Sequence, residues 1–270
     1  MSDTLSYLSN IHSPEDLRCL PEECITTLAQ EIRESLIGTI SKTGGHLASN
    51  LGVVELTIAV HRAFSTPHDH IIFDVGHQSY VHKMLTGRYE RMDSIRQAGG
   101  MSGFPKRSES EYDCFGTGHS STSLSAALGF ALSDQLDGSD AYTVAVIGDG
   151  AYTGGMIHEA LNNCRRDLKL IIILNENEMS ISKNIGRFAT NLAKLRTRSG
   201  YFQTKKTTGK IIRKIPLIGK PIFRLLLGSK KMLKNALYGS NYFESMGLTY
   251  RGPIDGNDYA EVEHLLCEAK

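Results

Sequence analysis

The sequence of 270 residues carries 30 Lys and Arg against 29 Asp and Glu, a net charge of +1, and 40% of its residues are hydrophobic. This apolar content is enough for a large buried core, and the length permits one or two domains. A net charge this close to zero does not indicate a nucleic acid or a membrane surface as the binding partner of the whole chain. No apolar run approaches the roughly 20 residues that a membrane-spanning helix needs, so we expect no membrane association.

The cysteines and the N-terminal segment indicate the compartment. The five cysteines are scattered, odd in number and without paired metal-ligand spacing. They predict reduced thiols rather than a disulfide framework or a zinc site. The first residues are acidic and lack the apolar core of a signal peptide. We therefore expect a cytoplasmic protein.

Helices and apolar strands alternate along the chain. Residues 13–40 predict an N-terminal helical segment, with Ser13 and Pro14 as its cap and first turn. The elements expected after it are a helix at about 50–64, a strand at 71–74, a helix ending at Gly87, a helix running to about Leu136, and strands at 142–147 and 169–174. Continuous apolar strands between helices are typical of a parallel sheet covered on both faces. The predicted fold is α/β, a doubly wound, mostly parallel sheet with helices on both faces.

The stretch 187–240 differs from the rest in composition. Thirteen Lys or Arg and no Asp or Glu lie between Lys194 and Lys234. We interpret it as a long, mobile excursion from a single domain that spans 1–270, before the chain returns to strand, turn and helix. Nucleic acid or an anionic membrane is an alternative partner for these charges. Few aromatic residues are interleaved and no groove-reading motif appears, so we expect a solvated loop and no nucleic acid.

A glycine-rich loop with an acid at its centre, "VAVIGDGAYTGG" at 144–155, follows one predicted strand. A right-handed crossover makes the strands at 142–147 and 169–174 parallel, so their carboxyl ends meet at one edge of the sheet. Asp149 and Asn177 can therefore converge there, and hard oxygen ligands of this kind suit Mg²⁺ bridging to a phosphate. The backbone N–H groups of Gly150 and Ala151 can approach the same phosphate.

Two other interpretations of this loop stay open. The pattern G-x-G-x-x-x-G is close to a dinucleotide-binding fingerprint, and Glu176 stands where a ribose-binding acid is expected. Against this, Asp149 would face a pyrophosphate without compensation. The remaining alternative is a structural turn without a ligand.

Three of the ten histidines share a local context. His46, His77 and His119 each follow a glycine in a turn just before a predicted helix. If these turns open on one sheet edge, three imidazoles converge on one cleft, and their ordinary pKa near 6.5 suits proton transfer. For any single histidine a structural role is the alternative. We interpret the other histidines as surface or packing residues, although His82 could line the cleft, and Arg88 as a solvated surface charge.

Several long motifs resemble one enzyme family. "GGHLASNLGVVELTIAVHRAF", "DVGHQSYVHKMLTGR", "SGFPKRSESEYDCFGTGHSSTS", "GDGAYTGGMIHEALNN" and "ILNENEMSISKNIG" resemble the 1-deoxy-D-xylulose-5-phosphate synthase family of transketolase-like enzymes. The resemblance runs from about Ile11 to the last residue and is weakest in the basic stretch. It implies the thiamine diphosphate-binding fold and, specifically, its diphosphate-binding domain.

The resemblance also implies roles for particular residues. It places Mg²⁺ ligands at Asp149, Asn177 and the backbone carbonyl of Met179, and catalytic histidines at His46 and His77. It places the contacts to thiamine diphosphate at His77, Gly118, His119, Ser120, Gly150, Ala151 and Asn177.

The activity implied is that of a transferase. The family condenses pyruvate with D-glyceraldehyde 3-phosphate, releases CO₂, feeds isoprenoid (terpenoid), thiamine and pyridoxal biosynthesis, and forms dimers. Its pyrimidine-binding and C-terminal domains have no counterpart here, so we expect the chain alone to be inactive. The sequence is then a piece of a longer protein, half of a split enzyme that needs a partner chain, or a non-catalytic cofactor-binding paralogue. A Rossmann-type NAD-dependent oxidoreductase is the remote alternative.

Overall fold

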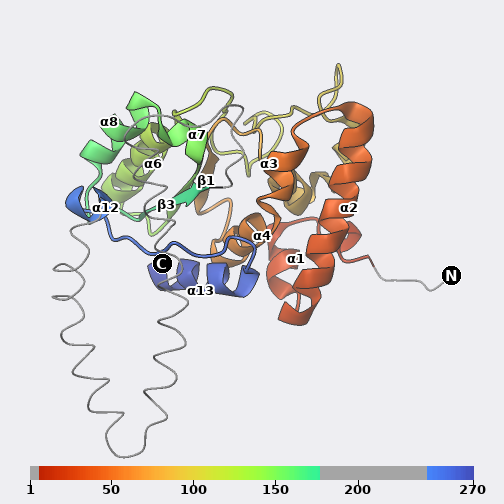
Figure 1. Ribbon diagram of the computed structural model, residues 1–270, viewed down its shortest axis with the longest axis horizontal. Helices are drawn as coiled ribbons and strands as arrows, with labels where there is room; N and C mark the ends of the chain where they lie inside the picture. The colour runs from red at the N-terminus through yellow and green to blue at the C-terminus, as the bar shows by residue number, and fades with distance from the viewer. Residues whose placement is uncertain (1–5, 177–241) are drawn as a thin grey trace, which may run out of the picture. The chain divides into compact units, whose positions relative to one another are not determined.

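The computed structural model describes residues 6–176 and 242–270 (Figure 1). They belong to two compact units, one containing 6–176 with 255–270 and the other 242–254. The predicted excursion at 187–240 lies outside the described residues, so it and the one-domain organisation stay predictions. In the part described, no helix is long and apolar enough to cross a membrane.

A parallel sheet forms the centre of the first unit. It contains β1 (His70–Phe73), β2 (Thr143–Gly148) and β3 (Leu170–Asn175) in the order β1-β2-β3. Both pairings are parallel, and Gly148 at the end of β2 lies opposite Asn175 at the end of β3. Each strand differs from its predicted position by one residue. The carboxyl ends therefore share one edge, as the sequence predicted.

Helices cover both faces of this sheet. On one face, α4 (Val54–Ala63) and α13 (Tyr259–Ala269) pack with alternate residues of β1 and β2 in one apolar cluster. On the other face, α6 (Ser123–Asp137) contacts the three strands, and α8 (Gly155–Asn163) packs against α6. Figure 1 shows α6 and α8 on one side of the strands and α13 on the other. The doubly wound α/β prediction is confirmed.

The N-terminal helical segment is divided into two helices. Ser13 caps α1 (Pro14–Cys19), and Ser13 and Asp16 form a reciprocal capping box. The chain then breaks at Leu20, because a residue that precedes a proline is disfavoured in the helical region, and resumes in α2 (Ile25–Thr43). The helix expected at 50–64 is divided as well, into α3 and α4. The remaining elements of the first unit are η1 (Leu8–Asn10), η2 (Glu22–Cys24), α3 (Leu47–Leu51), α5 (Tyr80–Lys83), a π-helical turn η3 (Met84–Arg88), η4 (Tyr89–Ser94) and α7 (Asp149–Tyr152).

The second unit is described only over a short segment. The described segment begins with α12 (Tyr242–Ser245). Gly247, just after this helix, has a left-handed backbone conformation. The rings of Phe243 and Tyr250 stack with centroids 5.5 Å apart. The strand expected in this segment is not formed among residues 242–254. A helical turn replaces it, and the N–H of Leu248 donates to the carbonyl of Phe243 as the chain leaves the helix.

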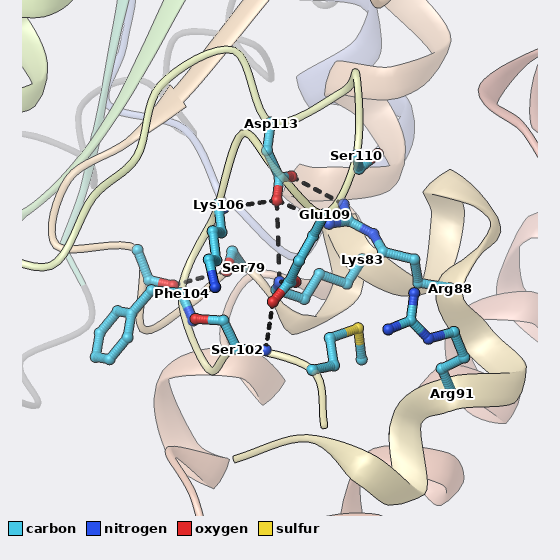
Figure 2. Close-up of polar contacts among 12 residues, drawn as sticks. Ser79, Lys83, Arg88, Arg91, Ser102, Phe104, Lys106, Glu109, Ser110 and Asp113 are labelled. Carbon is cyan, nitrogen blue, oxygen red and sulfur yellow. Dashed lines mark hydrogen bonds and ion pairs between the residues drawn. The ribbon is translucent and has the colours of Figure 1, made fainter. Parts of the chain in front are cut away.

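A long connection without regular structure runs from residue 95 to residue 122, between η4 and α6. Two carboxylates of this loop point back to two cations of α5 and η3 (Figure 2). Glu109 accepts a hydrogen bond from Nζ of Lys83 at 2.8 Å, and both carboxylate oxygens of Asp113 accept from Arg88, at 2.8 and 2.9 Å. Lys83, Arg88 and Asp113 are buried. The interpretation of Arg88 as a solvated surface charge is therefore wrong.

The same two carboxylates also hold the backbone of the loop. Glu109 accepts from the N–H of Ser102 at 2.7 Å, and Asp113 from the N–H of Lys106 at 2.8 Å. Burial alone would raise the pKa of Asp113. Hydrogen bonds from His82 and Arg88 outweigh this effect and hold that pKa well below its usual range. Charge pairing thus holds the loop together with the packing of its Ile95 and Met101 in an apolar cluster.

His82 extends this cluster into the helical layer. Its Nε2 lies 2.9 Å from Oδ1 of Asp113, and its Nδ1 lies 2.9 Å from Nε2 of His61 on α4. Nδ1 of His61 is in turn 3.4 Å from the hydroxyl of Thr66. Burial lowers the pKa of both histidines. His82 is therefore part of the buried framework and does not line a cleft.

Asp113→Asn should destabilise the protein strongly, because it leaves Arg88 buried without its full counter-charge. Breaking a buried pair in this way costs about 3–5 kcal/mol. We expect a loss of this size in the free energy of unfolding from urea titration at pH 7. The deficit should be full above the carboxyl's unfolded pKa of about 3.9 and shrink as the pH falls below it, since only the native Asp113 has a depressed pKa.

Asp93→Asn is the matched control. Asp93 is exposed on η4, so its substitution should change the unfolding free energy by no more than about 0.5 kcal/mol. Equal, small effects of the two substitutions on the free energy of unfolding would contradict the role of Asp113 in holding the loop.

Candidate functional site

Three turns meet at the carboxyl edge of the sheet. Residues 74–79 follow β1, residues 117–122 precede α6, and residues 148–154 begin with the last residue of β2. The predicted site residues of the described part lie in these turns, apart from His46, which precedes α3. The first turn holds His77, the second Gly118, His119 and Ser120, and the third Asp149, Gly150 and Ala151.

The structure brings His46 and His77 together. Their ring centroids are 5.2 Å apart in an edge-to-face arrangement. Phe104, from the long loop, lies beside them, with its centroid 6.3 Å from that of His46. The predicted pair of catalytic histidines is therefore contiguous, although 31 positions separate the two residues in the sequence.

Asn50 fixes the two histidine turns relative to each other. Its side-chain amide donates to the carbonyl of His46 at 2.6 Å and to the carbonyl of His77 at 2.8 Å, and its Oδ1 accepts from the N–H of Tyr80 at 2.9 Å. Asn50 is fully buried. It is not among the site residues predicted from the sequence. The available signal was an Asn inside the mostly apolar stretch "LASNLGVV", because a buried amide must find partners.

Partial desolvation affects the protonation of the pair. It lowers the pKa of His46, although this residue is exposed, and the nearby Arg96 guanidinium lowers it further. It also lowers the pKa of His77, an effect that His46 reinforces and Asp74 opposes. Both imidazoles are therefore neutral at neutral pH. Nδ1 of His77 is buried and, in the part of the chain that the structure describes, has no hydrogen-bond partner.

His119 stands apart from this pair. Its side chain is exposed, and its Nδ1 lies 3.0 Å from the carbonyl of Ser120. Within the described residues no ring contact joins His119 to His46 or His77. Of the three imidazoles expected in one cleft, the structure brings two together, while the third lies in the neighbouring turn.

Close backbone packing joins the first two turns. Val75 has a φ of 58° and Gly76 a φ of 86°, so the chain turns sharply just after β1. A Cβ on Gly76 would lie 2.2 Å from Oγ1 of Thr117 and 2.5 Å from Cδ of Pro105. Left-handed φ is costly for a β-branched residue such as Val75, and such outliers concentrate at functional sites. The requirement for glycine at position 76 is therefore steric as well as conformational.

The third turn holds the predicted metal ligand. Asp149 is buried as the first residue of α7, and the register of β2 with β3 places it beside the chain that leads to Asn177. Asn177 and Met179 themselves lie outside the described residues, so the predicted ligand set stays a prediction. Among residues 6–176 and 242–270, no cluster of three or more His, Cys, Asp or Glu side chains forms a metal site.

The glycines of the second and third turns leave open space. A Cβ built on Gly118, Gly148 or Gly150 meets no atom of residues 6–176 or 242–270 within 4 Å. A carboxylate and open glycine turns at the carboxyl edge of a parallel sheet suit a metal-bound phosphate group. The residues present thus fit the group that the sequence motifs imply.

Comparison with known proteins shows the family. The family model described as 1-deoxy-D-xylulose-5-phosphate synthase matches residues 8–270. The chain belongs to the 1-deoxy-D-xylulose-5-phosphate synthase family. The 1-deoxy-D-xylulose-5-phosphate synthase of Syntrophomonas wolfei is 52% identical over 264 residues, which are 97% of this chain and 41% of that protein. The synthase of Natranaerobius thermophilus is 50% identical over 271 residues, covering 100% of this chain and 42% of that protein.

Solved structures show the same fold at low sequence identity. Transketolase from Campylobacter jejuni matches with a TM-score of 0.64 and 18% identity, over 93% of this chain and 36% of that one. Transketolase from Leishmania mexicana matches with a TM-score of 0.58 and 18% identity, over 95% and 34%. Because the chain belongs to the synthase family, the dinucleotide-binding interpretation of the glycine-rich loop is dropped. The chain is the N-terminal part, spanning about two fifths of the length of these synthase relatives.

His77 should titrate below the ordinary histidine pKa of about 6.5, and His46→Asn should raise its pKa. The reason is that His46 adds a like charge on protonation and disfavours the protonated form of His77. Histidine NMR signals followed from pH 8 to pH 4 measure both values. His68→Asn, at an exposed histidine, serves as the control, and an unchanged pKa for His77 in the His46 variant would contradict coupling of the pair.

Proposed function

We propose that this chain binds thiamine diphosphate with Mg²⁺ and forms the N-terminal part of a 1-deoxy-D-xylulose-5-phosphate synthase. The reaction is the transketolase-like condensation of pyruvate with D-glyceraldehyde 3-phosphate, with loss of CO₂, in isoprenoid precursor biosynthesis. The observation that carries the proposal is the meeting of open glycine turns, Asp149 and the His46–His77 pair at one sheet edge, in a chain whose family is this synthase.

The cofactor would be held by the second and third turns. Asp149, Asn177 and the carbonyl of Met179 would ligate the metal, and His77 would contact the cofactor. The diphosphate would lie against Gly118, His119, Ser120, Gly150 and Ala151. When bound, thiamine diphosphate supplies an electron sink for decarboxylation of a 2-oxo acid.

His46 and His77 would provide the proton-transfer groups of this half of the site. The lowered pKa values of both imidazoles favour their neutral forms at neutral pH, so each ring has one nitrogen that accepts a proton and one that donates. The unpartnered Nδ1 of His77 is the atom we expect to contact bound ligand, because an unsatisfied buried polar atom is costly. Asn50 would keep the two rings at a fixed separation while protons move.

The rest of the enzyme would come from outside this sequence. The chain spans about 41% of its curated relatives, so we propose that the pyrimidine-binding region is supplied by the remainder of a longer protein or by a partner chain, in a dimeric assembly. The isolated chain would then bind cofactor without turnover. The five free cysteines fit a reducing, cytoplasmic compartment. A non-catalytic paralogue that binds the same cofactor is the second candidate, favoured if no partner restores activity.

Calorimetric titration with thiamine diphosphate, with and without Mg²⁺, tests the proposal. We expect magnesium-dependent binding, weakened at least tenfold by Asp149→Asn, because an amide cannot supply the carboxylate charge that the metal needs. The exposed Asp93→Asn serves as the control variant, and NADH serves as the control ligand. Binding that is independent of both Mg²⁺ and Asp149 would contradict the proposed site.

A further inference from the structure

We infer that Ser121 is a positioning residue that couples the diphosphate turn to the metal turn. It joins the turn that contains Gly118, His119 and Ser120 to the turn that contains Asp149, Gly150 and Ala151. The inference deepens the proposed function, and so rests on it, by assigning a role to a side chain that the predicted contacts leave out.

A direct hydrogen bond makes the connection. The hydroxyl of Ser121 donates to the backbone carbonyl of Ala151 at 2.9 Å. Ser121 directly follows Ser120, and Ala151 directly follows Gly150. The bond therefore links the two predicted phosphate-contacting segments residue to residue, across 30 positions of sequence. Ser121 is 7% exposed, so water competes little for this hydroxyl.

Asp74 holds the backbone of Ser121 in place. One carboxylate oxygen of Asp74 accepts from the N–H of Ser121 at 2.7 Å, and the other accepts from the N–H and hydroxyl of Ser123 at 3.1 and 2.6 Å. Asp74 itself follows β1 directly and is 1% exposed. The carboxylate thus anchors the start of α6 and the second turn to the edge of the sheet.

The backbone of Ser121 is held in a costly conformation. Its φ is 68°, in the left-handed region that residues other than glycine rarely adopt. Such a conformation persists only where surrounding contacts determine it. Here it lets the N–H of Ser121 reach Asp74 while the side chain reaches the third turn. The left-handed conformation of Ser121 therefore allows both the hydrogen bond to Asp74 and the bridge to Ala151.

Gly154 supplies the space for this contact. A Cβ at position 154 would lie 2.0 Å from Oγ and 2.8 Å from Cβ of Ser121. The backbone of Gly154 has φ −74° and ψ 142°, which any residue adopts, so glycine is needed there only for space. At the next position, a Cβ on Gly155 would meet no atom within 4 Å in the described part of the chain.

The consequence is preorganisation of the cofactor site. Contacts to a diphosphate and to its metal arise from separate turns, and binding is weakened if each turn must be ordered when the ligand arrives. The Ser121 bridge fixes their relative position beforehand. Removing it should reduce affinity for the metal–diphosphate group as a whole, without removing any group that touches it.

Ser121→Gly separates this role from a purely structural one. Glycine accepts the left-handed φ without strain, which offsets the entropy it adds to the unfolded chain. We therefore expect a thermal unfolding midpoint close to that of the wild type. Loss of the hydroxyl should nevertheless weaken magnesium-dependent thiamine diphosphate binding about tenfold in calorimetric titration.

Gly154→Ala and Gly155→Ala provide a matched pair at adjacent positions. The first displaces the Ser121 hydroxyl and should weaken binding as Ser121→Gly does. The second meets open space and should bind like the wild type. Wild-type affinity in Ser121→Gly, or equal losses in the two alanine variants, would overturn the coupling.

Hydrogen exchange tests the bridge without relying on cofactor binding. In the chain without ligand, the backbone amides of residues 149–154 should exchange faster in Ser121→Gly and Gly154→Ala than in the wild type or Gly155→Ala. This result would support the coupling even if the wild-type chain failed to bind thiamine diphosphate, a failure that would count against the proposed function alone. Unchanged exchange in both variants would overturn the coupling.

Discussion

The parallel register of β1, β2 and β3 is the constraint on which the rest of the structure depends. Because the three strands run in one direction, every turn that leaves a carboxyl end opens at the same edge. Helices on both faces bury β1 and β2 almost completely, so polar side chains gather at that edge. Residues as distant in sequence as His77 and Asp149 thereby come to lie in turns at one edge of the sheet.

Buried polar side chains then fix the irregular segments around that edge. Asn50 joins the two histidine turns, Asp74 holds the entry to α6, and Asp113 holds the long loop. Each accepts from or donates to backbone groups of an irregular segment. An unsatisfied buried group is costly, so each such residue favours a single arrangement of its loop. The apolar clusters position the helices, whereas these few polar side chains position the turns and the loop around the candidate site.

The sequence predicted the strands and their direction, because hydrophobic periodicity and right-handed crossovers determine these features. The shared Gly-His turns predicted that His46, His77 and His119 converge, and the structure brings the first two of them together. The sequence did not reveal Asn50, Asp74 or Ser121. Their partners are mostly backbone atoms, and a backbone partner leaves no residue type to recognise. Arg88 was misinterpreted for a related reason, since its burial depends on Asp113, 25 positions away. The strand expected near the C-terminus was replaced by α12, whose short apolar pattern is ambiguous between helix and strand.

The chain of buried hydrogen bonds from Thr66 through His61 and His82 to Asp113 has one direction. Asp113 accepts from Nε2 of His82, so Nδ1 of His82 must accept from Nε2 of His61, whose Nδ1 is left to accept from the Thr66 hydroxyl. Each proton shared along these three hydrogen bonds therefore has one position. One more proton on either ring would set two N–H groups against each other or leave the Thr66 hydroxyl without its acceptor. Thr66 thus belongs to the same hydrogen-bonded unit as Asp113 of the long loop, which also carries Phe104 to His46.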